Sequence, residues 1–173
     1  LPRGHDHFER WLEAQENRIR ENWPWMLEEF EGVAEGAGQE YEDIMMLNFR
    51  VWQYDIYGAP SQDAQCSSLA ITLQDGTVAN AGALDDPWRL YCGAVKFAPN
   101  EGLTHITFPI TGRSWSNRAM NSEGLCMGIS SQSLPGMERK ENVICKDLAI
   151  RLIIQNCTKV GDVTDLGKKY PSH

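Results

Sequence analysis

Cys66 stands where a polar linker meets a strand-like pattern, and its thiol is the leading candidate for a nucleophile. The stretch GAPSQDAQ, residues 58–65, has the glycine, proline and polar side chains typical of a linker. After Cys66, the apolar residues Leu69, Ile71 and Leu73 alternate with small ones, as they do along a strand. A buried cysteine is often inert core filler, but that interpretation does not explain why this one follows a linker.

Cutting the peptide bond before Cys66 would place a nucleophile and a base on one residue. A free α-amine has a pKa of about 7.7–8.0, so near neutral pH it can accept the thiol proton directly or through one water. This chemistry requires a leader, a flexible linker and a cysteine that opens a strand of a rigid sheet. Residues 58–73 have that arrangement, which predicts self-cleavage between Gln65 and Cys66.

A cysteine–histidine pair is the alternative arrangement for thiol chemistry. Of the four histidines, His105 is the one we place within the folded region, and its strand-like surroundings are more typical of a half-buried structural histidine. The other cysteines are Cys92, Cys126, Cys145 and Cys157. The total of five is odd and contains no Cys-x-x-Cys pair, which disfavours a disulfide framework and a zinc site. We therefore expect no metal or cofactor, and a reducing compartment such as the cytoplasm.

Composition limits the classes of partner. The chain has 173 residues, enough for one domain with a sizeable core. Its net charge of −8, with no offsetting lysine and arginine cluster, argues against a nucleic-acid surface. A membrane-spanning helix needs a run of about 18 apolar residues, and the sequence has none. A small-molecule substrate is the expected partner.

The order of patterns predicts an α+β fold. Apolar residues at helical spacing, including Phe8, Trp11 and Ile19, predict helices through most of the first sixty residues. Asp75-Gly76 is a strong hairpin signal. Strands are predicted over residues 66–73, 77–84, 92–97 and 104–110 and after a turn at Glu123-Gly124, and a last helix over 144–153. We therefore expect helices, then antiparallel strands, then a helix.

Three stretches together carry a resemblance to a known family. They are MLEEFEGVAEGAGQEYEDIMMLNFR (26–50), CSSLAITLQDGT (66–77) and MNSEGLCMGISS (120–131). In order and spacing they resemble the pro-segment, the nucleophile strand with its hairpin, and a later strand of the isopenicillin-N acyltransferase-like (acyl-coenzyme A:6-aminopenicillanic acid acyltransferase) family. That family belongs to the N-terminal-nucleophile hydrolases and is related to the choloylglycine hydrolases.

The resemblance implies a four-layer αββα sandwich, self-cleavage before Cys66, and hydrolysis of a linear amide or acyl transfer to an amine. Cys66 would be the nucleophile, and Asp86, with Asp85 as the alternative, would match the family's site aspartate. Residues 1–65 would be the helical pro-segment and linker, and residues 66–173 the N-terminal part of the sandwich. The family's oxyanion-hole asparagine and its arginine would lie in a C-terminal part that this chain lacks. A cleaved C-terminal part of its own or a second copy of the chain is a further expected partner.

Some residues depart from the family pattern. Leu84 stands where the family usually has asparagine, and Gln65 where glycine is more typical before the cut. Asp85 and Asp86 also read as turn residues, because Asp-Asp-Pro is good turn chemistry. These departures keep open a second function, a non-catalytic, precursor-like relative that acts as a binding module. For Arg113 we expect an ordinary surface position rather than a role in binding a substrate carboxylate.

Overall fold

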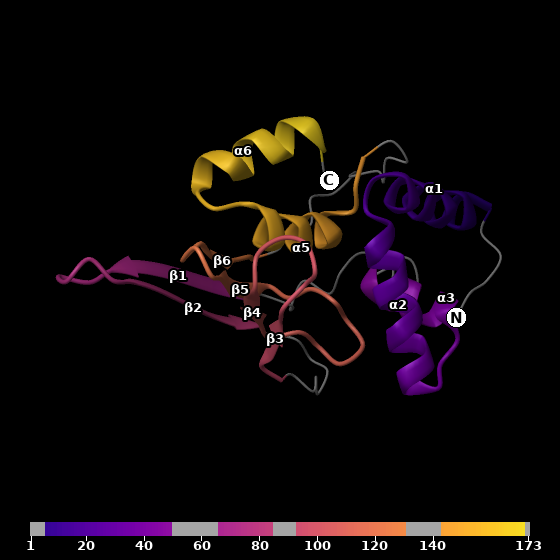
Figure 1. Ribbon diagram of the computed structural model, residues 1–173, viewed down its shortest axis with the longest axis horizontal. Helices are drawn as coiled ribbons and strands as arrows, with labels where there is room; N and C mark the ends of the chain where they lie inside the picture. Colours follow the sequence, from indigo (N-terminus) through magenta and orange to yellow (C-terminus); the bar gives the residue numbers. More distant parts are fainter. Residues whose placement is uncertain (1–5, 50–65, 85–92, 131–142, 172–173) are drawn as a thin grey trace.

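The N-terminal part of the protein is helical. The computed structural model describes residues 6–49, 66–84, 93–130 and 143–171. Helices α1 (Asp6–Asn22), α2 (Pro24–Ala37) and α3 (Tyr41–Asn48) lie together at one end of the molecule (Figure 1). Helix α2 begins with its proline and ends at Gly38, whose left-handed φ of 62° lets its N–H reach the carbonyls of Ala34 and Glu35. The predicted helices are confirmed as far as Asn48, and residues 50–65, which include the rest of the predicted helical stretch and the linker, lie outside the described residues.

The strands form a hairpin and a four-stranded antiparallel sheet. The hairpin consists of β1 (Cys66–Thr72) and β2 (Val78–Leu84). The sheet has the order β3-β4-β5-β6, formed by Val95–Phe97, His105–Thr107, Arg118–Asn121 and Cys126–Gly128. Helices α5 (Lys146–Asn156) and α6 (Val160–Lys169) follow. The architecture is therefore α+β, as predicted, although β5 and α6 were not predicted from the sequence.

Helix α5 covers one face of the four-stranded sheet. Asn121 of β5 is buried, and its side-chain amide donates to the carbonyls of Ile154 at 3.0 Å and Cys157 at 2.7 Å. The neighbouring residues on the opposite face, Ile106 and Met120, are 41% and 48% exposed. The sheet is thus covered on the α5 side and open on the other, as far as the described residues extend.

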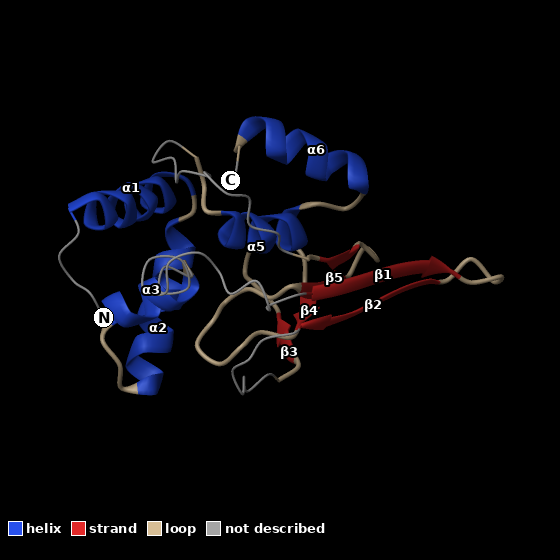
Figure 2. Ribbon diagram, turned by 180° about the vertical axis from the view of Figure 1, so that it is seen from behind, coloured by secondary structure: helices blue, strands red, loops and turns tan. Residues whose placement is uncertain are grey.

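The β1–β2 hairpin projects from the body as an arm, in both views (Figures 1 and 2). Its turn forms at the predicted place, where Gly76 has a φ of 85° and the Asp75 carboxylate accepts a bond from the Thr77 N–H at 2.9 Å. Leu69 and Ile71, which the alternating pattern placed on one face, are 56% and 43% exposed. The strand pattern is confirmed, but no described residue buries this face.

The core contains residues from both sides of Cys66. It packs α1, α2 and α3 against α5, and its largest fully buried members include Trp11, Phe30, Phe49, Leu148 and Leu152. Burying each such side chain contributes about 1.5–3 kcal/mol. The buried Gln15 side chain crosses between the two parts, donating to the Val143 carbonyl and accepting from the Cys145 N–H, both at 2.9 Å. No helix among the described residues is both long and apolar enough to cross a membrane.

Candidate functional site

Cys66 is the first residue of β1, a half-buried free thiol at the base of the arm. Successive side chains of a strand point to opposite faces, so Cys66 shares its face with Ser68. The Ser68 hydroxyl lies 2.8 Å from the hydroxyl of Ser130, which follows β6. Cys66 and Ser68 are about 7 Å apart along β1. Cys66 therefore lies on the hairpin face that is turned toward the end of the four-stranded sheet.

Arg118 of β5 joins the base of the arm to the sheet. Its Nη2 donates to the Ser67 carbonyl at 2.7 Å and to the Ser68 hydroxyl at 3.0 Å. Its Nη1 donates to the carbonyls of Asn117 at 2.7 Å and Ile129 at 2.9 Å. A planar guanidinium suits such a double fork, because its donors are held in fixed directions. Arg118 thereby fixes the peptide group between Ser67 and Ser68, one residue beyond Cys66 along β1.

Gly82 makes this close approach possible. It pairs with Ser68 across the hairpin, and a Cβ built on it would overlap the guanidinium of Arg118. A side chain at this position would therefore displace the guanidinium from its place against the hairpin. Gly82 thus leaves room for the Arg118 guanidinium to bind β1 close to Cys66.

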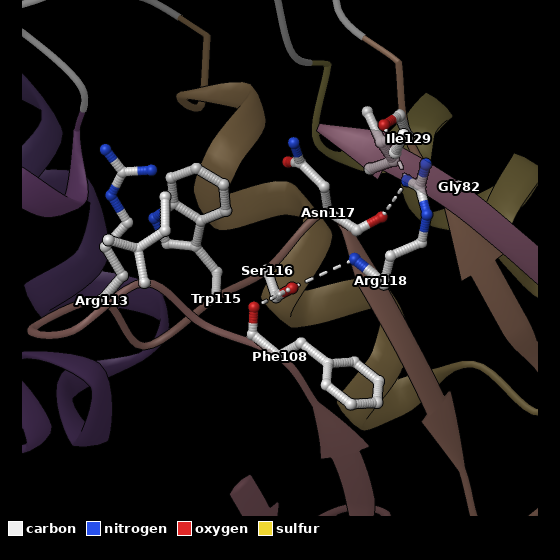
Figure 3. A pocket seen from close by; sticks show the side chains of 10 residues that line it. Gly82, Phe108, Arg113, Trp115, Ser116, Asn117, Arg118 and Ile129 are labelled. Atoms are coloured by element: carbon white, nitrogen blue, oxygen red, sulfur yellow. Dashed lines mark hydrogen bonds between the residues drawn. The ribbon is translucent and has the colours of Figure 1, made fainter. Parts of the chain in front are cut away.

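A cavity of about 140 Å³ lies beside Gly82 and Arg118 (Figure 3). Figure 3 shows Trp115 and Arg113 on one side of it, and Arg118, Ile129 and Gly82 on the other. Its lining is apolar at Ala83, Phe108, Ile110, Trp115 and Ile129 and polar at Arg113, Ser116, Asn117 and Arg118. Mixed lining of this kind suits a ligand with an apolar group and one polar end.

The cavity lies at the Cys66 end of the arm. Two of its lining residues, Gly82 and Ala83, pair with Ser68 and Ser67, the residues that follow Cys66 along β1. Because neighbouring strands lie about 5 Å apart, a ligand in the cavity would lie within a short reach of this end of the hairpin. The cavity and Arg118 therefore lie within two residues of Cys66 along the hairpin, although Cys66 itself does not line the cavity.

Arg113 differs from the sequence-based expectation. Its side chain is only 5% exposed, and its guanidinium lies 5.0 Å from the centre of the Trp115 ring. The expected surface position is therefore wrong, because the aromatic ring offers the cation a buried stacking surface. Arg113 is part of the cavity wall.

His105 is not a partner of Cys66 in this structure. It is 1% exposed on the α5 side of the sheet, where it stacks on Phe97 with ring centres 5.2 Å apart. Its Nδ1 bonds the Leu103 carbonyl at 2.8 Å, and its Nε2 has no hydrogen-bond partner among the described residues. Burial lowers the pKa of His105, and the hydrogen bond to the Leu103 carbonyl offsets only part of that decrease. The residue is a structural histidine, buried more deeply than its strand pattern indicated.

Other predicted site residues cannot be placed next to Cys66. Gln65, Asp85 and Asp86 lie outside the described residues. Asp75 is exposed at the hairpin turn, and its bonds to Thr77 lower the pKa of its carboxyl. It serves the turn, as its position in an Asp-Gly pair predicted.

A second cluster of charges supports the cavity wall from behind. Arg151 of α5 is buried and pairs with Glu29 of α2 at 3.0 Å. Its Nη1 donates to the Ser114 carbonyl at 2.9 Å, and its guanidinium lies 4.1 Å from the centre of the Phe97 ring. Burial raises the pKa of Glu29, while the positive charge of Arg151 opposes that rise. This ion pair joins the helical part to the segment that precedes Trp115.

Comparison with known proteins adds no relative. No protein-family model matches this chain, and a search of curated proteins also returns no match. The family resemblance therefore stays a prediction from the three sequence stretches.

Proposed function

We propose that the protein is a self-processing cysteine amidohydrolase or acyltransferase that acts on a small acyl or amide substrate. The observation that carries the proposal is the position of Cys66. It is a free thiol that opens a strand near a cavity, and Arg118 holds the Ser67–Ser68 peptide group one residue further along that strand. Nucleophilic catalysis needs a thiol in a fixed position beside a space for the acyl group.

In the proposed processing step, the Cys66 sulfur attacks the carbonyl carbon of Gln65. The carbon–nitrogen bond of that peptide breaks, and its nitrogen takes a proton to become the free α-amine of Cys66. The product is a thioester, which water hydrolyses to a Gln65 carboxylate and the regenerated thiol. Afterwards the same residue carries both nucleophile and base.

In the proposed turnover, the α-amine accepts the thiol proton as the sulfur attacks the substrate acyl carbon. The amine then passes this proton to the leaving group, and a thioester acyl-enzyme forms. Water or an acceptor amine releases the acyl group. Donors near the arm must stabilise the oxyanion, a contribution of about 3–4 kcal/mol for one well-placed donor. The side-chain amide of Asn117 in the cavity wall and the hairpin N–H groups are the candidates.

The resemblance extends the proposal to the fold. The four-stranded sheet with α5 on one face is compatible with two layers of an αββα sandwich. The open face at Ile106 and Met120 is where a second sheet would pack. The site aspartate of the family is proposed at Asp86, with Asp85 as the alternative.

Intact mass and N-terminal sequencing of the purified chain test the processing step. We expect a fragment that begins at Cys66, its loss in Cys66→Ala, and its retention in Cys126→Ala, which removes another half-buried free thiol. An uncut chain that still hydrolyses amides would refute self-processing. If the chain is uncut and inactive, and iodoacetamide modifies Cys66 no faster than Cys126, the alternative of a non-catalytic binding module is favoured instead.

A further inference from the structure

Asn48, the last residue of α3, is fully buried and satisfies both ends of its side-chain amide. Its Nδ2 donates to the carbonyls of Ile44 and Gly112, both at 3.0 Å. Its Oδ1 accepts the Ser114 N–H at 2.9 Å and the Ser114 hydroxyl at 3.3 Å. Three of these four bonds hold a single segment, residues 112–114, more than sixty positions further along the chain.

The main chain of Asn48 holds the next residue of the same segment. The indole N–H of Trp115 donates to the Asn48 carbonyl at 2.8 Å. Gly112, with a φ of 84°, approaches the Leu47 side chain so closely that a Cβ there would meet it at 2.6 Å. The C-terminal end of α3 therefore fixes the backbone position of residues 112–115 through hydrogen bonds and packing.

This segment is one wall of the cavity. Arg113, Trp115 and the following Ser116 all line it, facing Gly82 and Arg118 (Figure 3). A displacement of the segment would change the width of the space between Trp115 and the arm. The residue that fixes the segment thus also fixes the width of the cavity.

We propose that Asn48 is a positioning residue for the substrate cavity, which makes the helical segment before Cys66 a part of the binding site. The inference rests on the proposed function, since it assigns the cavity to the acyl group of the substrate. Asn48 touches no reacting atom and acts through the wall at Arg113 and Trp115. Cleavage before Cys66 leaves this role intact, because the bonds between Asn48 and residues 112–115 are non-covalent.

Only a side chain with a donor and an acceptor side by side can make these bonds. A carboxylate in Asn48→Asp keeps the shape and the acceptor but loses the donor, which leaves a buried charge facing the Gly112 carbonyl. Protonation of the introduced carboxylate restores one O–H donor. Because burial raises the pKa of a carboxyl, the variant will be defective at alkaline pH and will recover as the pH falls.

The test uses the full chain and acyl p-nitroanilides of graded chain length as substrates. For Asn48→Asp we expect KM to rise about tenfold relative to the wild type at pH 8 and to return within about twofold at pH 5. The kcat should stay within about twofold, because Cys66 and its amine are untouched. The matched control is Asn22→Asp, whose exposed amide likewise donates to a carbonyl four residues earlier in its helix, at 2.9 Å.

A second measurement does not depend on activity. In Cys66→Ala protein with ¹⁵N-labelled tryptophan, the Trp115 indole signal, assigned by Trp115→Phe, should shift in Asn48→Asp and not in Asn22→Asp. A Trp115 signal and a KM that both stay unchanged in Asn48→Asp overturn the positioning role, whatever the wild type does. Absence of cleavage and of activity in the wild type, together with a shifted Trp115 signal, instead overturns the proposed function and leaves the wall contact standing.

Discussion

The clearest prediction concerns Arg118→Met, which removes the guanidinium with its four hydrogen bonds and keeps an aliphatic side chain. The substitution deletes two bonds between the arm and the sheet, those to the Ser67 carbonyl and the Ser68 hydroxyl. A hydrogen bond from a charged donor contributes about 1.5–3 kcal/mol. Both acceptors belong to exposed residues, so water replaces part of each bond and the loss should total about 2–3 kcal/mol.

This loss lowers the population of arms that hold Cys66 beside the cavity. Since each 1.36 kcal/mol corresponds to a factor of ten in rate, self-cleavage and kcat/KM should fall roughly 30- to 160-fold. Gly82→Ala should give a similar fall, because its Cβ overlaps the guanidinium of Arg118. Arg118→Lys should fall between the wild type and Arg118→Met, since a single ammonium cannot span all four acceptors.

Time courses of cleavage by intact mass, with kcat/KM measured on the cleaved protein, check this prediction. Hydrogen exchange of the β1 amides reports the docking of the arm directly. The control is Arg20→Met, which removes an exposed arginine bound only to Glu16 of the same helix in the described structure. If Arg118→Met processes within about twofold of the wild type and β1 exchange is unchanged, the arm does not depend on Arg118 and the reasoning is wrong.

Two further predictions concern stability. The pKa of Glu29 is raised in the folded state, so the native protein binds this proton more tightly than the unfolded chain does. The contribution of Glu29 to the free energy of unfolding should therefore increase as the pH falls from neutral toward the ordinary pKa of glutamate, and should level off below that pKa. Urea unfolding at several pH values should show this trend in the wild type, and Glu29→Gln should lack it, because a glutamine amide does not titrate in this range. Asn121→Ala should lower the free energy of unfolding by about 2–4 kcal/mol, since two buried carbonyls lose their donor. Asn156→Ala should cost under about 1 kcal/mol, because Asn156 is exposed and its amide donates to the Leu152 carbonyl alone among the described residues. Equal losses in the two variants would contradict the assignment.

The elements with strong local patterns were predictable. Helices α1 to α3 have apolar residues at helical spacing, and the hairpin has an Asp-Gly turn between alternating strands. Strand β5 was missed because its four residues, RAMN, show no alternation of apolar and polar side chains. Helix α6 was missed because its ten residues hold two glycines and only three apolar side chains, which is a weak helical signal in the sequence.

The site was predictable only at Cys66, whose linker and strand start are local signals. Arg118 and Asn48 act on residues about 50 to 66 positions away in the sequence, and no local pattern encodes such pairings. The one available hint for Arg118 was its place two residues before the start of the MNSEGL stretch. In the arm, the alternation of apolar and small side chains indicated a strand. It could not indicate whether another part of the protein covers the apolar face.

The shared core has a consequence for how stability depends on protein concentration. While the chain is intact, the bonds of Gln15 with Cys145 and of Glu29 with Arg151 are intramolecular, and dilution cannot weaken them. If the bond before Cys66 is cut, the same contacts become an interface between two polypeptides that cannot bury these side chains separately. Unfolding then releases two molecules instead of one, and the melting temperature rises with concentration by mass action. One hydrolysed peptide bond would thus change the molecularity of folding without moving a single side chain of the core.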